Sequence, residues 1–268
     1  MLRDITIGQY YPAKSCIHRL DPRTKIVGTL LYIVSLFLFR SFPGFLVVGT
    51  AFAGVLILSR VPFRYMLRGL RPILMLLAFT VLCNFFLTSG EVVWQWKFLK
   101  LTKEGLQRGA FMGVRLILLI FGTSLMTYTT TPNQLTDGLE RLLSPLKVIH
   151  FPAHEIAMMM SIALRFIPIL TEEADRIRKA QMARGADMES GGPIKRAKAM
   201  IPVFIPLLVS AFRRAFDLAM AMEARCYHGG KGRTKMKPLR YHWGDLFGYL
   251  YLACYMATII TLRIWQKI

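Results

Sequence analysis

Five long apolar runs constrain the fold of this chain more than any other feature of its sequence. They lie at about residues 25–40, 42–59, 72–88, 109–130 and 244–262. Because a helix needs about 20 mostly apolar residues to cross the hydrocarbon core of a bilayer, each run predicts one membrane span. The first run is the weakest, since only Val27 to Phe39 is uncharged and Lys25 must extend its ammonium group to the interface. The sequence therefore predicts an all-α integral membrane protein with about five transmembrane helices.

The distribution of basic residues predicts which ends of these spans face the cytoplasm. The chain carries 35 Lys and Arg residues against 15 Asp and Glu residues, and cytoplasmic loops of membrane proteins are enriched in Lys and Arg. The segment before the first run is strongly basic, and so is the loop between the second and third runs. We therefore place the N-terminus and the long segment before the last run in the cytoplasm. This predicts an N-terminal membrane domain of about four spans (1–131), a cytoplasmic domain with two long helices (132–242) and a C-terminal transmembrane helix (243–268).

The loop between the second and third runs carries arginines at regular intervals. They are Arg60, Arg64, Arg68 and Arg71, and no acidic residue lies among them. Spacings of four, four and three residues place them on one face of a helix, where anionic lipid headgroups are the expected partner.

The cytoplasmic segment has the pattern of two long amphipathic helices. Apolar residues recur every three or four positions from Pro152 to Gly185, and again from about Pro193 to about His228. This is the period of one helical face. At 1.5 Å per residue each helix would be about 50 Å long, and its methionine-rich face must pack on the other helix, the membrane surface or another protein. An ordinary core between the two helices is the simpler alternative for the apolar pattern alone.

Each predicted helix ends in the same motif, Ala-x-x-Ala-Arg followed by a small residue. The two copies are Ala180 to Gly185 and Ala221 to Cys226. The helix dipole favours arginine at a helix C-terminus by about 0.3–1 kcal/mol, and this capping role is sufficient for either Arg184 or Arg225 alone. A planar guanidinium can also bind a carboxylate with two hydrogen bonds, and small neighbours let a partner approach closely. Two such motifs at two equivalent helix ends predict a protein that docks on two similar partners.

Metal and nucleotide sites are not indicated by the sequence. The five histidines form no ligand pattern, and no Gly-x-x-x-x-Gly-Lys-[Ser/Thr] phosphate loop occurs. Asp21-Pro22 is an efficient helix start, with Asp as N-cap and Pro at the first helical position, so folding alone can account for it. Arg23 and Lys25 can be simple interfacial anchors.

On these residues the chain resembles the T component, the transmembrane coupling subunit, of energy-coupling factor (ECF) vitamin transporters. This is a branch of the ABC transporters that also includes the membrane subunits of cobalt transporters. The resemblance covers essentially the whole chain. It is carried by an N-terminal motif and by the two helix-end motifs, which comprise Asp21, Pro22, Arg23, Lys25, Ala183, Arg184, Gly185, Ala224, Arg225 and Cys226. In that family the second helix-end motif more often ends in Gly or Ser, so Cys226 departs from the pattern while remaining small.

The resemblance implies a complex of several subunits in the cell membrane. Two cytosolic ABC ATPase subunits would bind and hydrolyse ATP, and a small membrane-embedded substrate-binding (S) subunit would bind the vitamin or metal ion. This chain would join them through the coupling helices of residues 132–242. Arg184 and Arg225 would each insert into a groove on one ATPase subunit and pair with an acidic residue there. The chain itself would be non-catalytic and would carry no cofactor.

Three other classes of protein fit the sequence less well. A membrane enzyme would be expected to place a cluster of Asp, Glu or His at the span ends, and none is evident. A nucleic-acid binder would carry a basic patch interleaved with aromatic residues in one water-soluble module. A self-contained secondary transporter is the main alternative, although such proteins more often show inverted repeats, broken spans and an ionisable site at the midplane.

Overall fold

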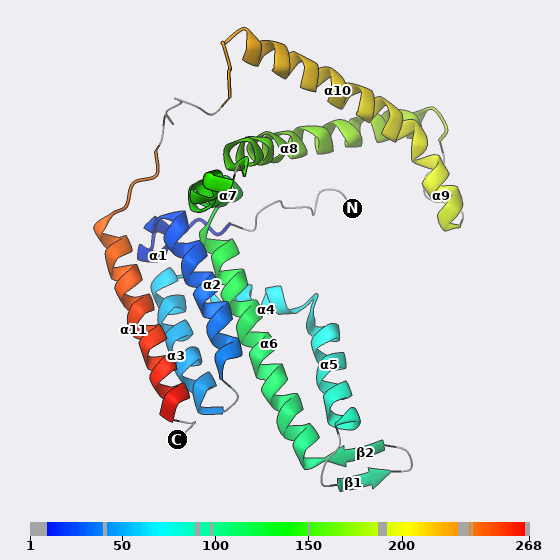
Figure 1. Cartoon of the computed structure of the whole chain (residues 1–268). Coiled ribbons are helices and arrows are strands. Elements are labelled where there is room, and N and C mark those ends of the chain that lie inside the picture. The colour runs from blue at the N-terminus through cyan, green and yellow to red at the C-terminus, as the bar shows by residue number, and fades with distance from the viewer. Residues whose placement is uncertain are drawn as a thin grey trace. The chain divides into compact units, whose positions relative to one another are not determined.

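The computed structural model describes residues 10–39, 42–88, 92–96, 99–149, 151–186, 192–229, 236 and 238–265. Within these residues the chain forms α-helices, one 3₁₀ segment and one two-stranded hairpin (Figure 1). The all-α fold class predicted from the sequence is thus confirmed. The chain divides into two compact units: the membrane unit, which comprises Gly8–Leu139 and Leu239–Ile268, and the two-helix unit, Glu140–Pro238.

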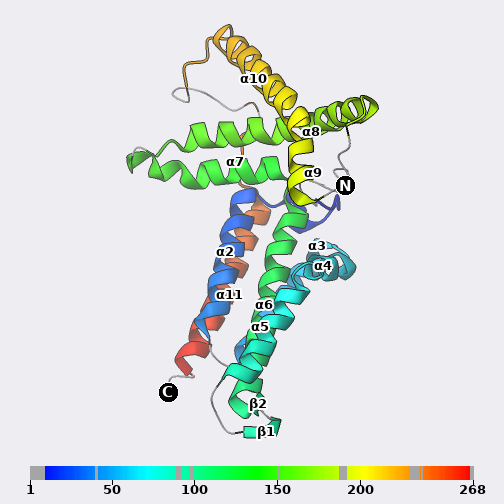
Figure 2. The ribbon, with the colours of Figure 1, turned by 90° about the vertical axis from the view of Figure 1, so that its right-hand side faces the viewer.

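The membrane unit is built around one long helix, α6. Its elements in chain order are α1 (Cys16–Arg19), α2 (Pro22–Leu38), α3 (Phe42–Ser59), α4 (Phe63–Leu70), α5 (Leu74–Leu87), β1 (Val92–Trp96), β2 (Leu99–Thr102), α6 (Lys103–Thr129), most of α7 (Pro132–Leu143) and α11 (Trp243–Trp265). Helices α2, α3, α4 and α5 all pack on α6, and α11 packs on α2 and α3 (Figure 2).

Two apolar clusters hold the membrane unit together. The first joins α2, α3 and α11 through the fully buried side chains of Leu36, Val48 and Ile259. The second joins α3, α4 and α6, with Met66 of α4 and Leu125 of α6 among its members. Outside these clusters many large apolar side chains of the spans are exposed, as expected for helices that face lipid.

The predicted spans agree with the helices to different degrees. The second run coincides with α3, and the last run corresponds to α11. The fourth corresponds to α6, which begins several residues earlier than predicted because Thr102 caps it by accepting a hydrogen bond from the N–H of Gly105 at 3.1 Å. The first is the 17-residue helix α2, and the third is the 14-residue helix α5.

Length and composition single out a different set of spanning helices from the predicted set. Among the described residues, four helices are long and apolar enough to cross a membrane, namely α3, α6, α8 (Ala153–Ala183) and α11, and a fifth span results if α4 and α5 count as one bent pair. The presence of α8 in this set has a clear cause. Its first eighteen residues, 153–170, carry only two charged side chains, whereas the next nine carry six.

The two-helix unit contains η2 (Ser144–Ile149), α8, α9 (Pro193–Ala199) and α10 (Ile201–Glu223). The single helix predicted from about Pro193 to about His228 is therefore wrong. It is broken at Met200, because Pro202 has no N–H to donate to the preceding turn and instead occupies the first turn of a new helix.

Two elements were not predicted at all, the β1–β2 hairpin and α7. The helix predicted to carry four arginines between the second and third runs is confirmed in part as α4. Arg64 and Arg68 lie on α4 and Arg71 is its C-cap, but Arg60 precedes the helix with a left-handed φ of 56°. The hairpin lies in the predicted loop 89–108, and its two strands pair antiparallel with a register irregularity between Val92 and Trp94.

Candidate functional site

Helices α8 and α10 pack on each other and run in opposite directions (Figures 1 and 2). The carboxylate of Glu173 on α8 joins them, since its Oε1 accepts a hydrogen bond from Ser210 Oγ at 2.6 Å and its Oε2 pairs with Arg214 Nη2 at 2.7 Å. Both partners of the ion pair are partly exposed, and such pairs contribute only about 0–1 kcal/mol. The pair therefore fixes which residues of the two helices face each other more than it stabilises their contact.

An apolar groove of about 310 Å³ lies between the two helices. Ile162, Phe166 and Leu170 of α8 line it together with Met222 of α10. On the α10 side the lining also includes alanines at every fourth position, Ala211, Ala215 and Ala219. Because these side chains are short, the two helices can approach closely.

A second apolar surface runs along α10. Five large side chains recur at every fourth position and are between 44% and 69% exposed, namely Phe204, Leu208, Phe212, Phe216 and Met220. We call these residues the α10 row. An exposed row of this kind marks a surface that contacts another protein or lipid.

The first arginine motif closes α8 as a Schellman motif. Gly185 takes a left-handed conformation with φ +87°, and its N–H donates to the carbonyl of Met182 at 3.0 Å. The N–H of Ala186 donates to the carbonyl of Gln181 at 3.0 Å. These two hydrogen bonds satisfy carbonyls that the end of a helix leaves without donors. Arg184 is thereby fixed directly before the left-handed residue.

The second arginine motif closes α10 in the same way. Cys226 takes a left-handed conformation with φ 54°, and its N–H donates to the carbonyl of Glu223 at 2.8 Å. The N–H of Tyr227 donates to the carbonyl of Met222 at 3.1 Å. Arg225 therefore occupies the position that Arg184 occupies in α8. The sequence repeat is a repeat of backbone geometry.

The arginines and their neighbours are displayed at the two helix ends. Ala183, Arg184, Gly185, Ala224, Arg225 and Cys226 are all exposed. Neither arginine forms an ion pair with another described residue. A guanidinium held in this way can donate two parallel hydrogen bonds to a carboxylate of another molecule.

The small residue of each motif has a conformational role that the sequence interpretation missed. A left-handed backbone brings Cβ close to the following carbonyl oxygen, which costs about 1–2 kcal/mol for residues other than glycine. We expect Cys226→Gly to stabilise the end of α10 by about 1 kcal/mol. Gly185→Ala should destabilise the end of α8 by a similar amount through backbone strain, because no heavy atom beyond Gly185 and its two chain neighbours lies within 4 Å of the added methyl group.

Hydrogen exchange followed by mass spectrometry would test this pair of substitutions. Exchange at the amides of residues 223–227 should slow in Cys226→Gly, and exchange at 182–186 should accelerate in Gly185→Ala. Each variant serves as the control for the other helix end. Unchanged exchange in both variants would contradict the conformational role.

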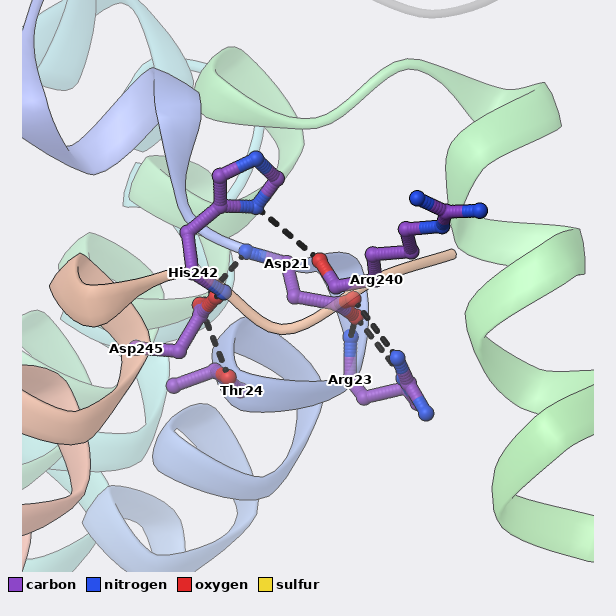
Figure 3. Close-up of polar contacts among 6 residues, drawn as sticks. All are labelled: Asp21, Arg23, Thr24, Arg240, His242 and Asp245. Atoms are coloured by element: carbon purple, nitrogen blue, oxygen red, sulfur yellow. Dashed lines mark hydrogen bonds and ion pairs between the residues drawn. The ribbon is translucent and has the colours of Figure 1, made fainter. Parts of the chain in front are cut away.

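The N-terminal motif forms a separate polar cluster in the membrane unit (Figure 3). Asp21 caps α2 by accepting from the N–H of Arg23 at 2.9 Å, and Pro22 stands in the first turn. The Arg23 side chain returns to the same carboxylate with contacts of 3.0 and 2.8 Å, and its guanidinium lies 3.9 Å from the centre of the Tyr241 ring. Burial acts to raise the pKa of Asp21, but the hydrogen bonds from the side chain and backbone of Arg23 outweigh it and hold this pKa below its usual value.

Asp245, which the sequence interpretation overlooked, joins the starts of α2 and α11. It is 1% exposed. Its Oδ1 accepts from the N–H of Asp21 at 2.7 Å and from Thr24 Oγ1 at 3.1 Å. Its Oδ2 accepts from the N–H of His242 at 2.8 Å, which is the backward contact of a capping box at the start of α11 (Figure 3). One carboxylate thus satisfies three donors from two helices.

Lys25 ties the end of α6 to this cluster. Its ammonium group donates to the carbonyls of Thr129 at 2.8 Å and His18 at 3.2 Å, and the residue is 9% exposed. The carbonyl end of a helix is a favourable place for a cation. Lys25 and Arg23 are therefore more than the simple interfacial anchors that the sequence allows, because both side chains are engaged within the protein.

The structure groups the predicted residues into two sets, one in each unit. Arg184, Arg225 and their neighbours belong to the two-helix unit, and the N-terminal motif belongs to the membrane unit. Within the part of the chain that the structure describes, no three His, Cys, Asp or Glu side chains are grouped so that they could hold a metal ion.

Comparisons with known proteins agree over the length of the chain. The family model described as cobalt transport protein (CbiQ) matches residues 13–236. A protein of Acidaminococcus fermentans is 53% identical over 263 residues, covering 96% of each chain. Relatives from Clostridium kluyveri and Bacillus subtilis are 51% and 46% identical, and each alignment covers at least 98% of both chains. All three carry the name energy-coupling factor transporter transmembrane protein EcfT.

Proposed function

This chain belongs to the cobalt transport protein (CbiQ) family, and from that membership we propose that it is the transmembrane coupling subunit of an ECF-type ABC importer. It would transmit the ATP-driven motion of two cytosolic ATPase subunits to a separate membrane subunit that binds a vitamin or another micronutrient. The name shared by its relatives supports this assignment. The chain would take part in transport without catalysing ATP hydrolysis.

The observation that carries the proposal is the repeated arginine end of α8 and α10. Two identical helix terminations present one guanidinium each, and identical terminations suit two similar docking partners. Arg184 precedes the start of α10 and Arg225 follows its end, and α10 is 23 residues long, about 35 Å. Two ATPase subunits would each receive one arginine and bind it through an acidic side chain.

The contact between α8 and α10 suggests how motion would pass through the chain. The two helices are joined at Glu173 by hydrogen bonds to Ser210 and Arg214, while their arginine ends lie away from this joint. When ATP binding brings the ATPase subunits together, the arginine ends would move with them and the angle between the helices would change. The α10 row would then shift beneath the substrate-binding subunit, for which this apolar surface is suited.

We propose a cytoplasmic location for the N-terminus and for the two-helix unit. The excess of Lys and Arg in these segments supports it. The charged second half of α8 is unsuited to a bilayer core, because each ionised side chain at the centre of a span costs about 2.5–3.5 kcal/mol. The apolar first half of α8 is compatible with a helix that lies against the membrane or against another membrane protein.

Purification of the tagged chain from its native membrane in mild detergent would test the proposal. We expect mass spectrometry to identify two ATP-binding-cassette proteins, or two copies of one, and a small hydrophobic membrane protein in stoichiometric amounts. Recovery of the chain alone, with uptake after reconstitution that needs no ATP, would contradict it and would favour a self-contained secondary transporter.

A further inference from the structure

The connections of helix α4 hold it close to the ends of two apolar helices. α3 ends at Ser59 and α5 begins at Leu74, so only residues 60–62 precede α4 and only 71–73 follow it. α4 and α5 are bent by 65° from each other. A helix joined so tightly to two apolar helices cannot extend far into the water. It therefore lies within reach of the headgroup layer.

The side chains of α4 divide into three faces. Met66 is fully buried in the cluster formed with α3 and α6. Phe63 and Leu67, one turn apart, are 51% and 50% exposed. Arg64 and Arg68 are exposed on the remaining face. This arrangement, with one face on protein, one apolar edge and one basic edge, is typical of a helix that lies in the plane of a bilayer interface.

Four exposed arginines gather along this segment, and we call them the α4 arginines: Arg60, Arg64, Arg68 and Arg71. The sequence has no Asp or Glu from Pro22 to Gly90. The α4 arginines form no ion pair with the described residues, and the guanidinium of Arg68 lies 5.3 Å from the centre of the Tyr65 ring. Since no carboxylate of the described residues pairs with these arginines, their guanidinium groups are available to an anionic group outside the protein.

The length of α5 brings this charge close to lipid phosphates. α5 has 14 residues, about 21 Å, whereas the hydrocarbon core of a bilayer is about 30 Å thick. A short span draws its flanking residues toward the core, and long basic side chains respond by extending to the headgroups. The α4 arginines are placed for this, while Phe63 and Leu67 reach the acyl chains.

We propose that the α4 arginines bind the phosphate groups of anionic phospholipids, with Phe63 and Leu67 inserted among the acyl chains. A guanidinium donates two parallel hydrogen bonds to a phosphate. Lipid bound on the exposed faces of α4 would keep the opposite face, which carries Met66, packed against α6. This inference does not depend on the proposed coupling function.

Lipid retention by the full chain would test the inference. The chain is reconstituted in nanodiscs of equal parts phosphatidylglycerol and phosphatidylcholine, extracted with mild detergent, and weighed by native mass spectrometry. We expect wild-type protein to retain phosphatidylglycerol preferentially. Attraction to anionic lipid contributes about fivefold in affinity per basic residue, so replacing the four α4 arginines with glutamine should lower this retention at least tenfold.

A matched control removes four basic residues elsewhere, as K195Q, R196Q, K198Q and R213Q, and should retain phosphatidylglycerol normally. Replacing the α4 arginines with lysine keeps the charge but loses the planar donor pair, so intermediate retention is expected, and this variant also controls for folding. Equal retention by the glutamine variant and the matched control would overturn the inference. Unchanged lipid retention with loss of a co-purifying protein would overturn it too, by assigning the α4 arginines to a protein partner.

Discussion

A chain in which both Arg184 and Arg225 are replaced with alanine should lose uptake while still inserting into the membrane. In the proposed docking role, each arginine would pair with a carboxylate of one ATPase subunit, and each substitution would leave that carboxylate without its partner. Truncating one member of such a pair at an interface costs about 2–5 kcal/mol, a factor of about thirty or more in affinity. Insertion should survive because the Schellman hydrogen bonds at both helix ends are made by the backbone. Co-purification of the ATPase subunits and ATP-dependent uptake in proteoliposomes are the two measurements.

Two sets of variants separate docking from capping. Lysine at both positions keeps the favourable charge at the helix C-terminus but loses the two parallel hydrogen bonds, so association should fall without a change in helix stability. Arg165→Ala with Arg213→Ala removes exposed arginines from the same two helices away from their ends, and it should leave association intact. Each single variant should weaken assembly less than the double variant. Normal uptake and normal association in the double alanine variant would refute the docking role.

The features that sequence patterns predicted well are those determined by neighbouring residues. α3 coincides with its apolar run because an uninterrupted run is bounded at its end by Arg60, Val61 and Pro62. Asp21-Pro22 starts α2 as predicted because the capping carboxylate and the N–H group that donates to it lie within three residues of each other. The ends of α8 and α10 were placed within a few residues by the arginine motifs. Local rules are sufficient for these features.

The features that sequence patterns missed depend on distant contacts or on competing local preferences. Asp245 contacts Asp21 and Thr24, more than two hundred residues earlier, and in sequence it is only one acid at the edge of an apolar run. The sequence does carry one signal for it. Asp245 stands three residues after His242, which is the spacing between the N-cap and the third helical residue in a capping box. Lys25 was assigned to the interface because its carbonyl partner Thr129 belongs to another helix. Pro202 indicates the helix break at Met200. Apolar residues nevertheless recur every three or four positions on both sides of the break, and this pattern favours a single helix.

Helix α8 shows where hydropathy alone is insufficient. The helix passes the length and composition test for a span, yet Glu173 in its charged half makes specific bonds to Ser210 and Arg214 of α10. A membrane helix and a helix that binds a membrane protein both need a long apolar face. Only the charge distribution along the helix and its partner contacts distinguish them.

Replacing Asp245 with alanine should strongly destabilise the membrane unit. The carboxylate accepts hydrogen bonds from the N–H groups of Asp21 and His242 and from the hydroxyl of Thr24, and at 1% exposure water cannot replace it. Each buried donor left unsatisfied costs about 1–3 kcal/mol, so we expect a loss of about 3–5 kcal/mol. Thermal unfolding in detergent should show a midpoint lowered by about 10 °C.

The comparison of variants identifies the source of this loss. Thr24→Val removes one donor along with its need for an acceptor and should cost about 1 kcal/mol. It should cost less still in the Asp245→Ala background, because the two residues share one network. Asp217→Ala removes an exposed carboxylate from α10 and should leave the midpoint unchanged. A midpoint of Asp245→Ala equal to that of Asp217→Ala would show that the starts of α2 and α11 do not depend on this carboxylate.

The chain from α10 re-enters the membrane unit at α11, so a loosened first turn of α11 should also reduce uptake more than it reduces binding of the ATPase subunits.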